Sequence, residues 1–189
     1  MKLLMWRGVV YKSWEQCKIQ TQPDGYHVES LITGNYRGKI FTVNYVLRLD
    51  KHWCIQNFEI HPEIDSTGDL IKGIKVGDEW EINGTVRPEF KGLLYIDISL
   101  TPFTNSLPIN NLMLMVDQSF KIGVIYIDIF HKDIRRVNQR YTRKSKDEYF
   151  YENYDSNFIS PISVDRNGIV RSYPNLFELV REGIGKNNE

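Results

Sequence analysis

Two acidic residues in strand-like segments, Glu15 and Asp97, are the best placed for acid–base chemistry. Glycoside cleavage needs two carboxyl groups at a fixed separation, one protonated and one ionised, and Glu15, Asp97 and Asp165 could supply such a pair. The sequence has no nucleophile elbow, no glycine-rich phosphate loop and no His-Glu-x-x-His pattern. Carboxylates on surfaces and in turns are far commoner than catalytic ones. We therefore expect a protein that is not an enzyme, with a hydrolase of glycosides or esters acting through Glu15 and Asp97 as the alternative.

The histidines and cysteines do not have the spacing of metal ligands. Four histidines are scattered along the chain, and two cysteines are too few for a disulfide framework. Free thiols suit the reducing cytoplasm. We expect no metal, no cofactor and a cytoplasmic location.

Aromatic rings beside polar groups are typical of carbohydrate sites, because a pyranose stacks its apolar face on a ring while its hydroxyls bond to carboxylates and amides. The tryptophans are candidates, although most tryptophans belong to a core or a strand surface. They are Trp6, Trp14, Trp53 and Trp80. A second aromatic group consists of Tyr149, Tyr151, Tyr154 and Phe158. Strand register decides which of these rings face inward.

The segment from His131 to Lys146 is strongly basic, with seven Lys or Arg and one Asp, which could indicate a phosphate or nucleic-acid site. If it folds back as a tight hairpin, Arg143 faces Glu148 and Arg140 faces Tyr151, so that charges pair across the strands. The whole chain balances 24 basic against 24 acidic residues, so there is no global field for nucleic acid or anionic lipid, although a local patch could still serve. We expect no nucleic-acid partner.

Alternation of apolar and polar residues predicts strands through most of the chain. Lys39–Asp50 alternates strictly, and the runs 93–100 and 125–130 each have one chemically mixed face. Dipeptides that favour the positive φ angles of tight hairpins separate such runs. They are Asp24-Gly25, Asn83-Gly84 and Asn167-Gly168. Sequential antiparallel pairing is the expected arrangement.

The nine residues Thr101–Ile109 fit neither a helix nor a central strand, because two prolines remove backbone donors. They predict a shaped polar loop that leaves the preceding strand. Asn105 is its preferred contact with a ligand, and capping of its own backbone is the alternative role.

Only the segment from Pro174 to Gly183 is typical of a helix. With 189 residues, 41% of them apolar, the chain can bury a substantial core. We expect a mainly β protein, a large antiparallel sheet curled around one C-terminal helix, with residues 1–184 as one domain and 185–189 as a frayed polar tail. No apolar run approaches the length of a membrane span.

The order of several motifs resembles the putative glycolipid-binding protein family of bacteria over nearly the whole chain. The motifs are Trp6-Arg7-Gly8, Ser13 with Glu15, Trp53, the loop Thr101–Ile109, Gln139-Arg140-Tyr141, and Asp165 to Val170 followed by Tyr173-Pro174. The resemblance implies a spiral β-roll wrapped around a single helix, a homodimer, and a glycolipid or other amphiphile as the ligand. Two features depart from the family pattern: the pair Asn110-Asn111 stands where a basic pair is common, and Tyr95 stands where an acidic residue is common. These changes would weaken recognition of an anionic headgroup.

The leading hypothesis is a non-enzymatic binding protein whose curled sheet encloses an amphiphilic cavity, with acyl chains against aliphatic residues. The residues expected to bind the ligand are Trp6, Glu15, Trp53, Asp97, Asn105, Arg140, Tyr141, Tyr151 and Tyr173. A dimeric structural protein with a filled interior and no ligand is a further alternative.

Overall fold

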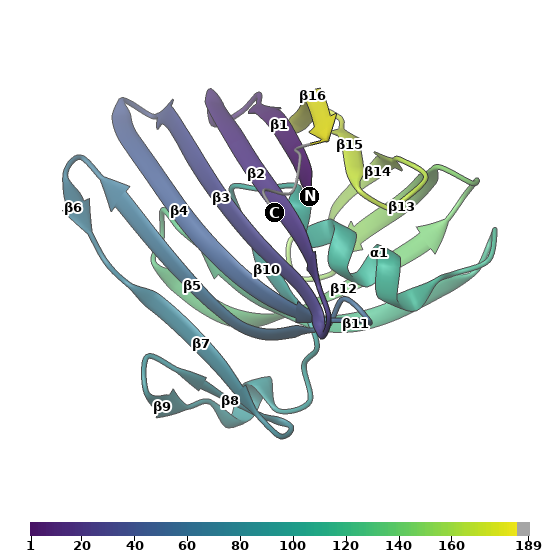
Figure 1. The fold of residues 1–189 in the computed structure, drawn as a ribbon, viewed down its shortest axis with the longest axis horizontal. Helices are drawn as coiled ribbons and strands as arrows, with labels where there is room; N and C mark the ends of the chain where they lie inside the picture. Colours follow the sequence, from purple (N-terminus) through teal and green to yellow (C-terminus); the bar gives the residue numbers. More distant parts are fainter. Residues whose placement is uncertain (185–189) are drawn as a thin grey trace.

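The computed structural model describes residues 1–184 and consists of one continuous sheet that curls around a short helix (Figure 1). The predicted tail 185–189 lies outside the described residues. The elements are β1 (Lys2–Gly8), β2 (Ser13–Gln22), β3 (Gly25–Tyr36), β4 (Lys39–Asp50), β5 (Ile55–Ile64), β6 (Thr67–Gly68), β7 (Ile71–Val76), β8 (Glu79–Ile82), β9 (Thr85–Val86), the 3₁₀ helix η1 (Pro88–Phe90), β10 (Ile96–Ile98), the 3₁₀ helix η2 (Phe103–Asn105), α1 (Ser106–Leu112), β11 (Ser119–Asp128), β12 (Asp133–Arg143), β13 (Glu148–Asn153), β14 (Phe158–Val164), β15 (Val170–Tyr173) and β16 (Phe177–Ile184).

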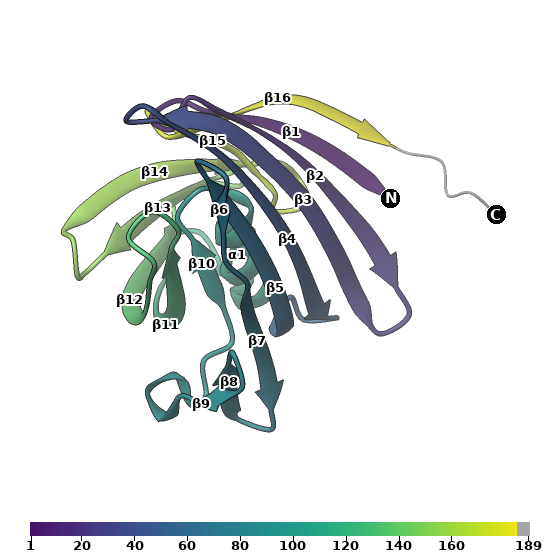
Figure 2. The ribbon, with the colours of Figure 1, turned by 90° about the vertical axis from the view of Figure 1, so that its left-hand side faces the viewer.

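The strand order places the beginning and the end of the described chain side by side. It reads β10-β11-β12-β13-β14-β15-β16-β1-β2-β3-β4-β5-β7-β8-β9, with β6 paired to β5. Neighbours are antiparallel except β10 and β11, which are parallel. The two end strands of this path, β10 and β9, do not pair, so the curled sheet stays open, and α1 lies inside the curl (Figures 1 and 2). The prediction of a mainly β fold with one α-helix is confirmed.

Strand alternation is confirmed most clearly in β4, whose inward residues are buried and whose bounds match the predicted run. The buried side chains of this strand are Phe41, Val43, Tyr45, Leu47 and Leu49. The predicted Asn83-Gly84 turn is also present between β8 and β9, with φ of 50° and 77°. At both places the signal is local, because neither depends on a distant partner.

The stretch Thr101–Ile109 is not a loop: it forms η2 and most of α1, and every residue in it is buried. Pro108 is the third residue of α1. The first backbone N–H groups of a helix have no partner within the helix, so a proline at this position removes no hydrogen bond. The α-helix of this fold therefore lies in the middle of the sequence and not at its C-terminal end.

The predicted C-terminal helix is wrong, because Phe177–Ile184 forms strand β16 between β15 and β1. Its apolar residues fit a helical period, yet Phe177 is buried while Val180 is exposed, as alternation in a strand requires. An isolated helix of two turns is marginal in water, whereas two unpaired strand edges offer this segment a full hydrogen-bond ladder.

The predicted register of the β12–β13 hairpin is wrong by one residue. Arg140 lies opposite Glu152, and Arg143 lies opposite Tyr149. The turn is longer than two residues, because the backbone N–H groups of Lys144 and Ser145 both donate to the carbonyl of Glu148. Charge pairing across the hairpin is still present, at Arg140 and Glu152, where a nitrogen and an oxygen lie 2.5 Å apart.

Of the predicted strand 93–100, only Ile96–Ile98 forms a strand, β10, and it runs parallel to β11. The carbonyls of Leu93 and Leu94 are occupied outside the ladder by the Trp80 indole N–H and the Ile55 backbone N–H. Sequential antiparallel pairing fails here because η2 and α1 intervene between the two strands, so that the chain returns in the same direction.

Candidate functional site

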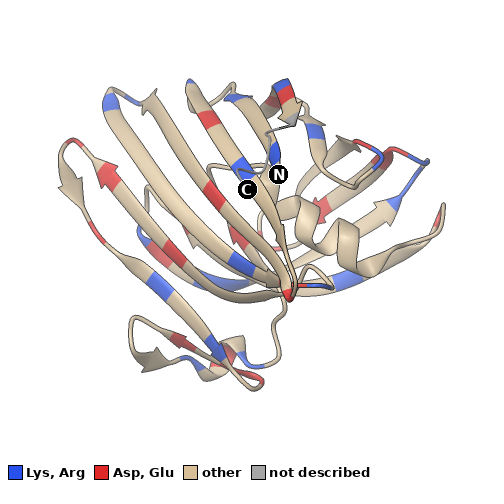
Figure 3. Cartoon of the chain, viewed as in Figure 1, with Lys and Arg blue, Asp and Glu red and all other residues tan. Residues whose placement is uncertain are grey.

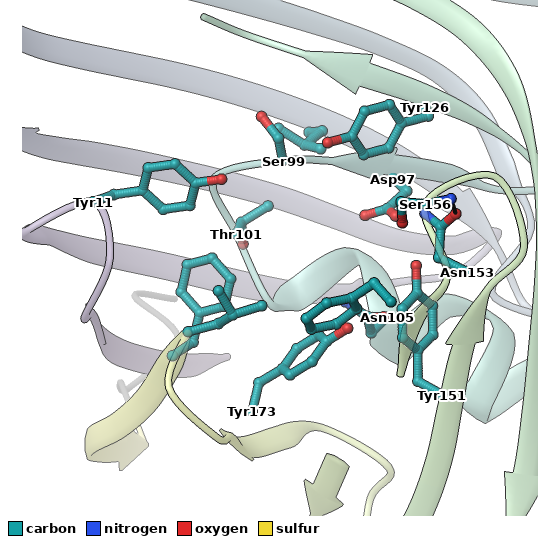
Figure 4. A pocket seen from close by; sticks show the side chains of 14 residues that line it. Tyr11, Asp97, Ser99, Thr101, Asn105, Tyr126, Tyr151, Asn153, Ser156 and Tyr173 are labelled. Carbon is teal, nitrogen blue, oxygen red and sulfur yellow. Dashed lines mark hydrogen bonds between the residues drawn. The ribbon is translucent and has the colours of Figure 1, made fainter. Parts of the chain in front are cut away.

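A hollow of about 210 Å³ lies where β10 and the segment after it meet the β1–β2 turn and the strands β11, β13 and β15 (Figure 4). We call it the Asp97 hollow. Its polar and aromatic lining includes Tyr11, Asp97, Thr101, Asn105, Tyr126, Tyr151, Phe158 and Tyr173.

Asp97 is the one charged residue among the described residues that line the hollow. Gln139 Nε2 donates to its carboxylate over 2.6 Å, and Thr104 Oγ1 donates over 3.2 Å. Burial raises the pKa of Asp97, and these two hydrogen bonds offset only part of that rise. The carboxyl group is thus held in place with acceptor capacity left for a ligand.

Four tyrosines surround Asp97 with their hydroxyls turned toward the space between them (Figure 4). Burial raises the pKa of each, and the nearby Asp97 charge adds to the rise, so all four keep their protons at neutral pH. For Tyr11 the pKa rises to about 12. Within residues 1–184, the hydroxyls of Tyr11, Tyr126 and Tyr173 have no hydrogen-bond partner. They are therefore free to donate to a ligand and to accept from it.

Asn105 contributes its side-chain amide to the wall of the hollow. A hydrogen bond from the core side of this wall fixes the orientation of the amide. The fully buried Tyr141 donates its hydroxyl hydrogen to Asn105 Oδ1 over 2.8 Å. That contact turns the amide nitrogen of Asn105, which has no acceptor in the described part of the chain, toward the hollow. The alternative role, capping of its own backbone, is not seen, since Asn105 makes no side-chain cap to α1.

The lining suits an uncharged polyhydroxyl compound. It combines one carboxylate with hydroxyls, amides and ring edges, and no Lys, Arg or His is among its described residues. Such groups match sugar hydroxyls, whereas an anionic group would meet Asp97 without a counter-charge. The volume of about 210 Å³ is below the roughly 300–1,000 Å³ of pockets for drug-sized ligands, so the hollow suits one small headgroup.

Several of the predicted ligand residues come together here. Asp97, Asn105, Tyr151 and Tyr173 line the hollow, and Tyr141 supports it. Tyr11 and Tyr126 were not predicted. Tyr126 lies directly beside Asp97 because β10 and β11 are paired in register, a contact that only the unpredicted parallel pairing creates, and Tyr11 comes from a turn with no sequence signal.

Three predicted residues lie elsewhere. Trp6 is fully buried, and its indole N–H donates to the carbonyl of Val170 over 2.9 Å. Trp53, which has a positive φ of 64°, packs against Tyr26 with ring centroids 4.5 Å apart. Arg140 is occupied by Glu152. None of the three is part of the Asp97 hollow.

Glu15 is buried beneath the hollow and reaches it only through Thr101. Its Oε1 accepts hydrogen bonds from Ser30 over 2.8 Å, Tyr45 over 2.6 Å and Thr101 over 2.9 Å. Its Oε2 is buried without a partner among the described residues. Burial raises the pKa of Glu15 to about 7, although the three hydroxyl donors lower it in part.

The hydrolase hypothesis requires two carboxylates facing one ligand. The lining of the hollow includes Asp97 but neither Glu15 nor Asp165, so the expected pair is not assembled there. Within the described residues, no group of three His, Cys, Asp or Glu side chains could hold a metal ion, and no helix is long and apolar enough to cross a membrane.

The two departures from the family pattern contact each other outside the hollow. Tyr95 donates its hydroxyl hydrogen to Asn111, and the Asn111 amide donates to the carbonyl of His52 over 2.8 Å. A neutral hydrogen bond thus occupies the place of the expected acidic and basic residues.

Known proteins resemble this chain over most of its length. The sequence model of a family described as "Putative glycolipid-binding" matches residues 3–179. A solved structure of a DUF1089 family protein from Pseudomonas aeruginosa is 32% identical, with a TM-score of 0.78, covering 88% of this chain and 91% of that chain. A β-barrel-like protein of the domain of unknown function DUF1849 from Brucella abortus has a TM-score of 0.57 at 10% identity, covers 98% of this chain and 95% of its own, and shares the fold alone. No curated protein matches the chain.

Proposed function

The chain belongs to the family described as "Putative glycolipid-binding", and on this basis we propose that it binds a glycolipid whose uncharged sugar headgroup occupies the Asp97 hollow. The observation that carries the proposal is the convergence of tyrosine hydroxyls on one carboxylate in a lining with no basic residue. Family membership alone leaves the position of the ligand open, and this hollow supplies the chemistry that a sugar needs.

Each group of the hollow has a role toward a sugar ring. The Asp97 carboxylate accepts from one or two sugar hydroxyls, and the amide nitrogen of Asn105 donates to another. The rings of Tyr151 and Tyr173, whose centroids are 5.8 Å apart, form an aromatic wall that continues to Phe158. Sugars bind well between such walls because one ring face is apolar and the edges are polar.

The acyl chains lie outside the hollow in this proposal, because a space of about 210 Å³ is filled by a headgroup. Apolar residues at the mouth supply a surface for them. Phe158, which lines the hollow, is 38% exposed, and Val9 is 42% exposed beside Leu176, to whose carbonyl it donates a backbone hydrogen bond. The sequence prediction of acyl chains enclosed within the sheet is replaced by this arrangement.

The binding role is non-enzymatic in this proposal, because one carboxylate faces the ligand. The homodimer and the cytoplasmic location expected from the sequence remain predictions of the same proposal. Sedimentation equilibrium and cell fractionation test them.

Lipid extraction from protein purified from its own host, followed by mass spectrometry, tests the proposal directly, and a neutral glycolipid is the expected product. Titration with n-octyl glucoside, n-octyl galactoside and n-octyl sulfate below their micelle concentrations adds a headgroup comparison. We expect the glycosides to bind and the sulfate not to bind, because Asp97 repels it. Absence of any amphiphile together with no binding to the glycosides contradicts the proposal. Fluorogenic glycosides and esters test the hydrolase alternative. If the protein turns them over and Asp97→Asn abolishes that turnover, the hydrolase replaces the proposed binding role.

A further inference from the structure

An apolar loop projects between α1 and β11, at the other end of the helix from Asn105. The large side chains of this loop and of Phe120, the second residue of β11, face solvent, with exposed fractions of 79% for Met113, 66% for Met115, 53% for Val116 and 53% for Phe120. We call these four residues the apolar loop. Several large exposed apolar residues close together in the chain are typical of interaction surfaces.

Hydrogen bonds hold the apolar loop in its exposed position. The Asp117 N–H donates to the carbonyl of Arg143 over 2.7 Å, and the Arg143 N–H donates to the carbonyl of Gln118 over 3.0 Å. The Arg143 guanidinium donates to the carbonyl of Leu114 over 2.8 Å, and the N–H of Met115 donates to the Gln118 side chain over 2.8 Å. Between the exposed side chains Leu114 is buried and anchors the loop. The exposure is therefore built into the fold.

A basic hollow adjoins the apolar loop. It has a volume of about 290 Å³, and Met113 lines it together with Arg143, Lys146 and Arg166. Among residues 1–184, no carboxylate lies within ion-pair distance of Lys146 or Arg166. The one acidic side chain in the lining, Asp165, is paired with Lys2. In Figures 1 and 3 the loop after α1 and the turn between β12 and β13, which carries basic residues, project at the same margin of the molecule.

We propose that this face docks on an anionic lipid surface, with the apolar loop in the headgroup region and Lys146 and Arg166 against lipid phosphates. An apolar anchor combined with basic residues is what reversible binding to anionic membranes requires. A second copy of the chain is the other occupant that such a face could take. The proposal is independent of the sugar site, since different residues carry it.

Co-sedimentation with vesicles tests the proposal. One set consists of phosphatidylcholine, and the other of phosphatidylcholine mixed with phosphatidylglycerol, with no glycolipid in either. We expect the protein to sediment with the anionic vesicles only and to be released by salt. Met115→Glu and Lys146→Glu each reduce this binding by on the order of tenfold. The matched control is Ile40→Glu, which changes a residue 66% exposed in the β3–β4 hairpin and leaves binding intact.

Failure of the protein to sediment with anionic vesicles overturns the proposal, and so does an equal loss in Ile40→Glu. Sedimentation velocity without lipid tests whether a second copy of the chain occupies this face instead of a membrane. A dimer that Met115→Glu dissociates, together with no vesicle binding, assigns the face to a second copy and overturns the proposal. Inorganic phosphate binding without vesicle binding does the same, because it reduces the basic hollow to a site for a free anion. Glycoside binding by Met115→Glu at the wild-type level separates this test from that of the sugar site.

Discussion

Tyr141 donates its hydroxyl hydrogen to the side-chain oxygen of Asn105 over 2.8 Å, from strand β12 to the end of η2. Tyr141 is 1% exposed and reaches no ligand itself. It determines which end of the Asn105 amide faces the hollow, so a residue behind the wall decides whether that wall offers a donor or an acceptor.

Tyr141→Phe is expected to weaken binding of n-octyl glucoside roughly 2- to 10-fold and to lower the free energy of unfolding by about 1–2 kcal/mol. The substitution leaves Asn105 Oδ1 without its donor, and the amide can then rotate. Calorimetric titration and urea unfolding measure the two effects. Unchanged affinity in a folded variant would show that the orientation of Asn105 does not matter for the ligand.

Asp97→Asn keeps the size of the side chain and removes its charge. Hydrogen bonds to a charged group contribute about 1.5–3 kcal/mol, so glycoside affinity should fall about 10- to 100-fold. Rejection of n-octyl sulfate should weaken as well, because Asp97 is the one charge among the described lining residues. Parallel titrations with n-octyl glucoside and n-octyl sulfate measure the expected loss of glycoside affinity and the expected weaker rejection of the sulfate. A variant that binds both as the wild type does would remove Asp97 from the site.

Tyr126→Phe and Tyr173→Phe each remove a hydroxyl that has no partner within residues 1–184. We expect the free energy of unfolding to stay within about 0.5 kcal/mol of the wild-type value, and glycoside affinity to fall roughly 2- to 10-fold in each. Tyr26→Phe is the control, because Tyr26 packs on Trp53 away from the hollow. An equal loss of affinity in the control would show that the effect is not local.

Glu15 makes stability depend on pH in a window between about 4.5, the ordinary pKa of the carboxyl group, and about 7 in the folded protein. Because the folded pKa is the higher one, the folded state binds more protons in this window, and the contribution of Glu15 falls as pH rises. The difference of 2.5 units corresponds to about 3 kcal/mol.

Glu15→Gln removes this titration. The difference in unfolding free energy between wild type and variant, measured in urea from pH 4 to pH 8.5, should therefore shift by about 3 kcal/mol in favour of the variant across the window. A constant difference would mean that Glu15 keeps one protonation state throughout.

Gly73→Ala tests the packing of β7 on β5. A Cβ atom at Gly73 would lie 2.2 Å from the ring of Phe58, whose side chain is fully buried and cannot move aside. We expect a loss of about 1–3 kcal/mol in unfolding free energy. Gly183→Ala is the matched control in a strand, since a Cβ there meets nothing within 4 Å and should leave stability nearly unchanged. Equal stabilities of the two variants would contradict this account of the core.

The parts of the fold that local pattern decides could be predicted from the sequence. The bounds and buried face of β4 follow from alternation, and the Asn83-Gly84 turn follows from its preference for positive φ. α1 could not be predicted in this way, because the cost of Pro108 depends on its place within the helix. β16 could not be predicted either, since the choice between strand and helix for this segment depends on the free edges of β1 and β15.

The same division holds for the candidate site. Asp97, Asn105, Tyr151 and Tyr173 were predicted as ligand residues and line one hollow. Tyr126 joins them through a parallel pairing that depends on the path of η2 and α1, which no alternation pattern encodes. Trp6, a predicted ligand residue that lies elsewhere, has the partner of its indole N–H within the core.

The pairing of β1 with β16 has a consequence for how the protein is made. β1 leaves the ribosome first among the strands, yet one of its two partners is the last described strand, more than 160 residues later. Until β16 emerges, β1 has an open edge in what becomes the middle of the sheet, and such long-range contacts form slowly. Until then the nascent chain carries a strand with one unpaired edge, a state that invites pairing with other chains and calls for chaperones.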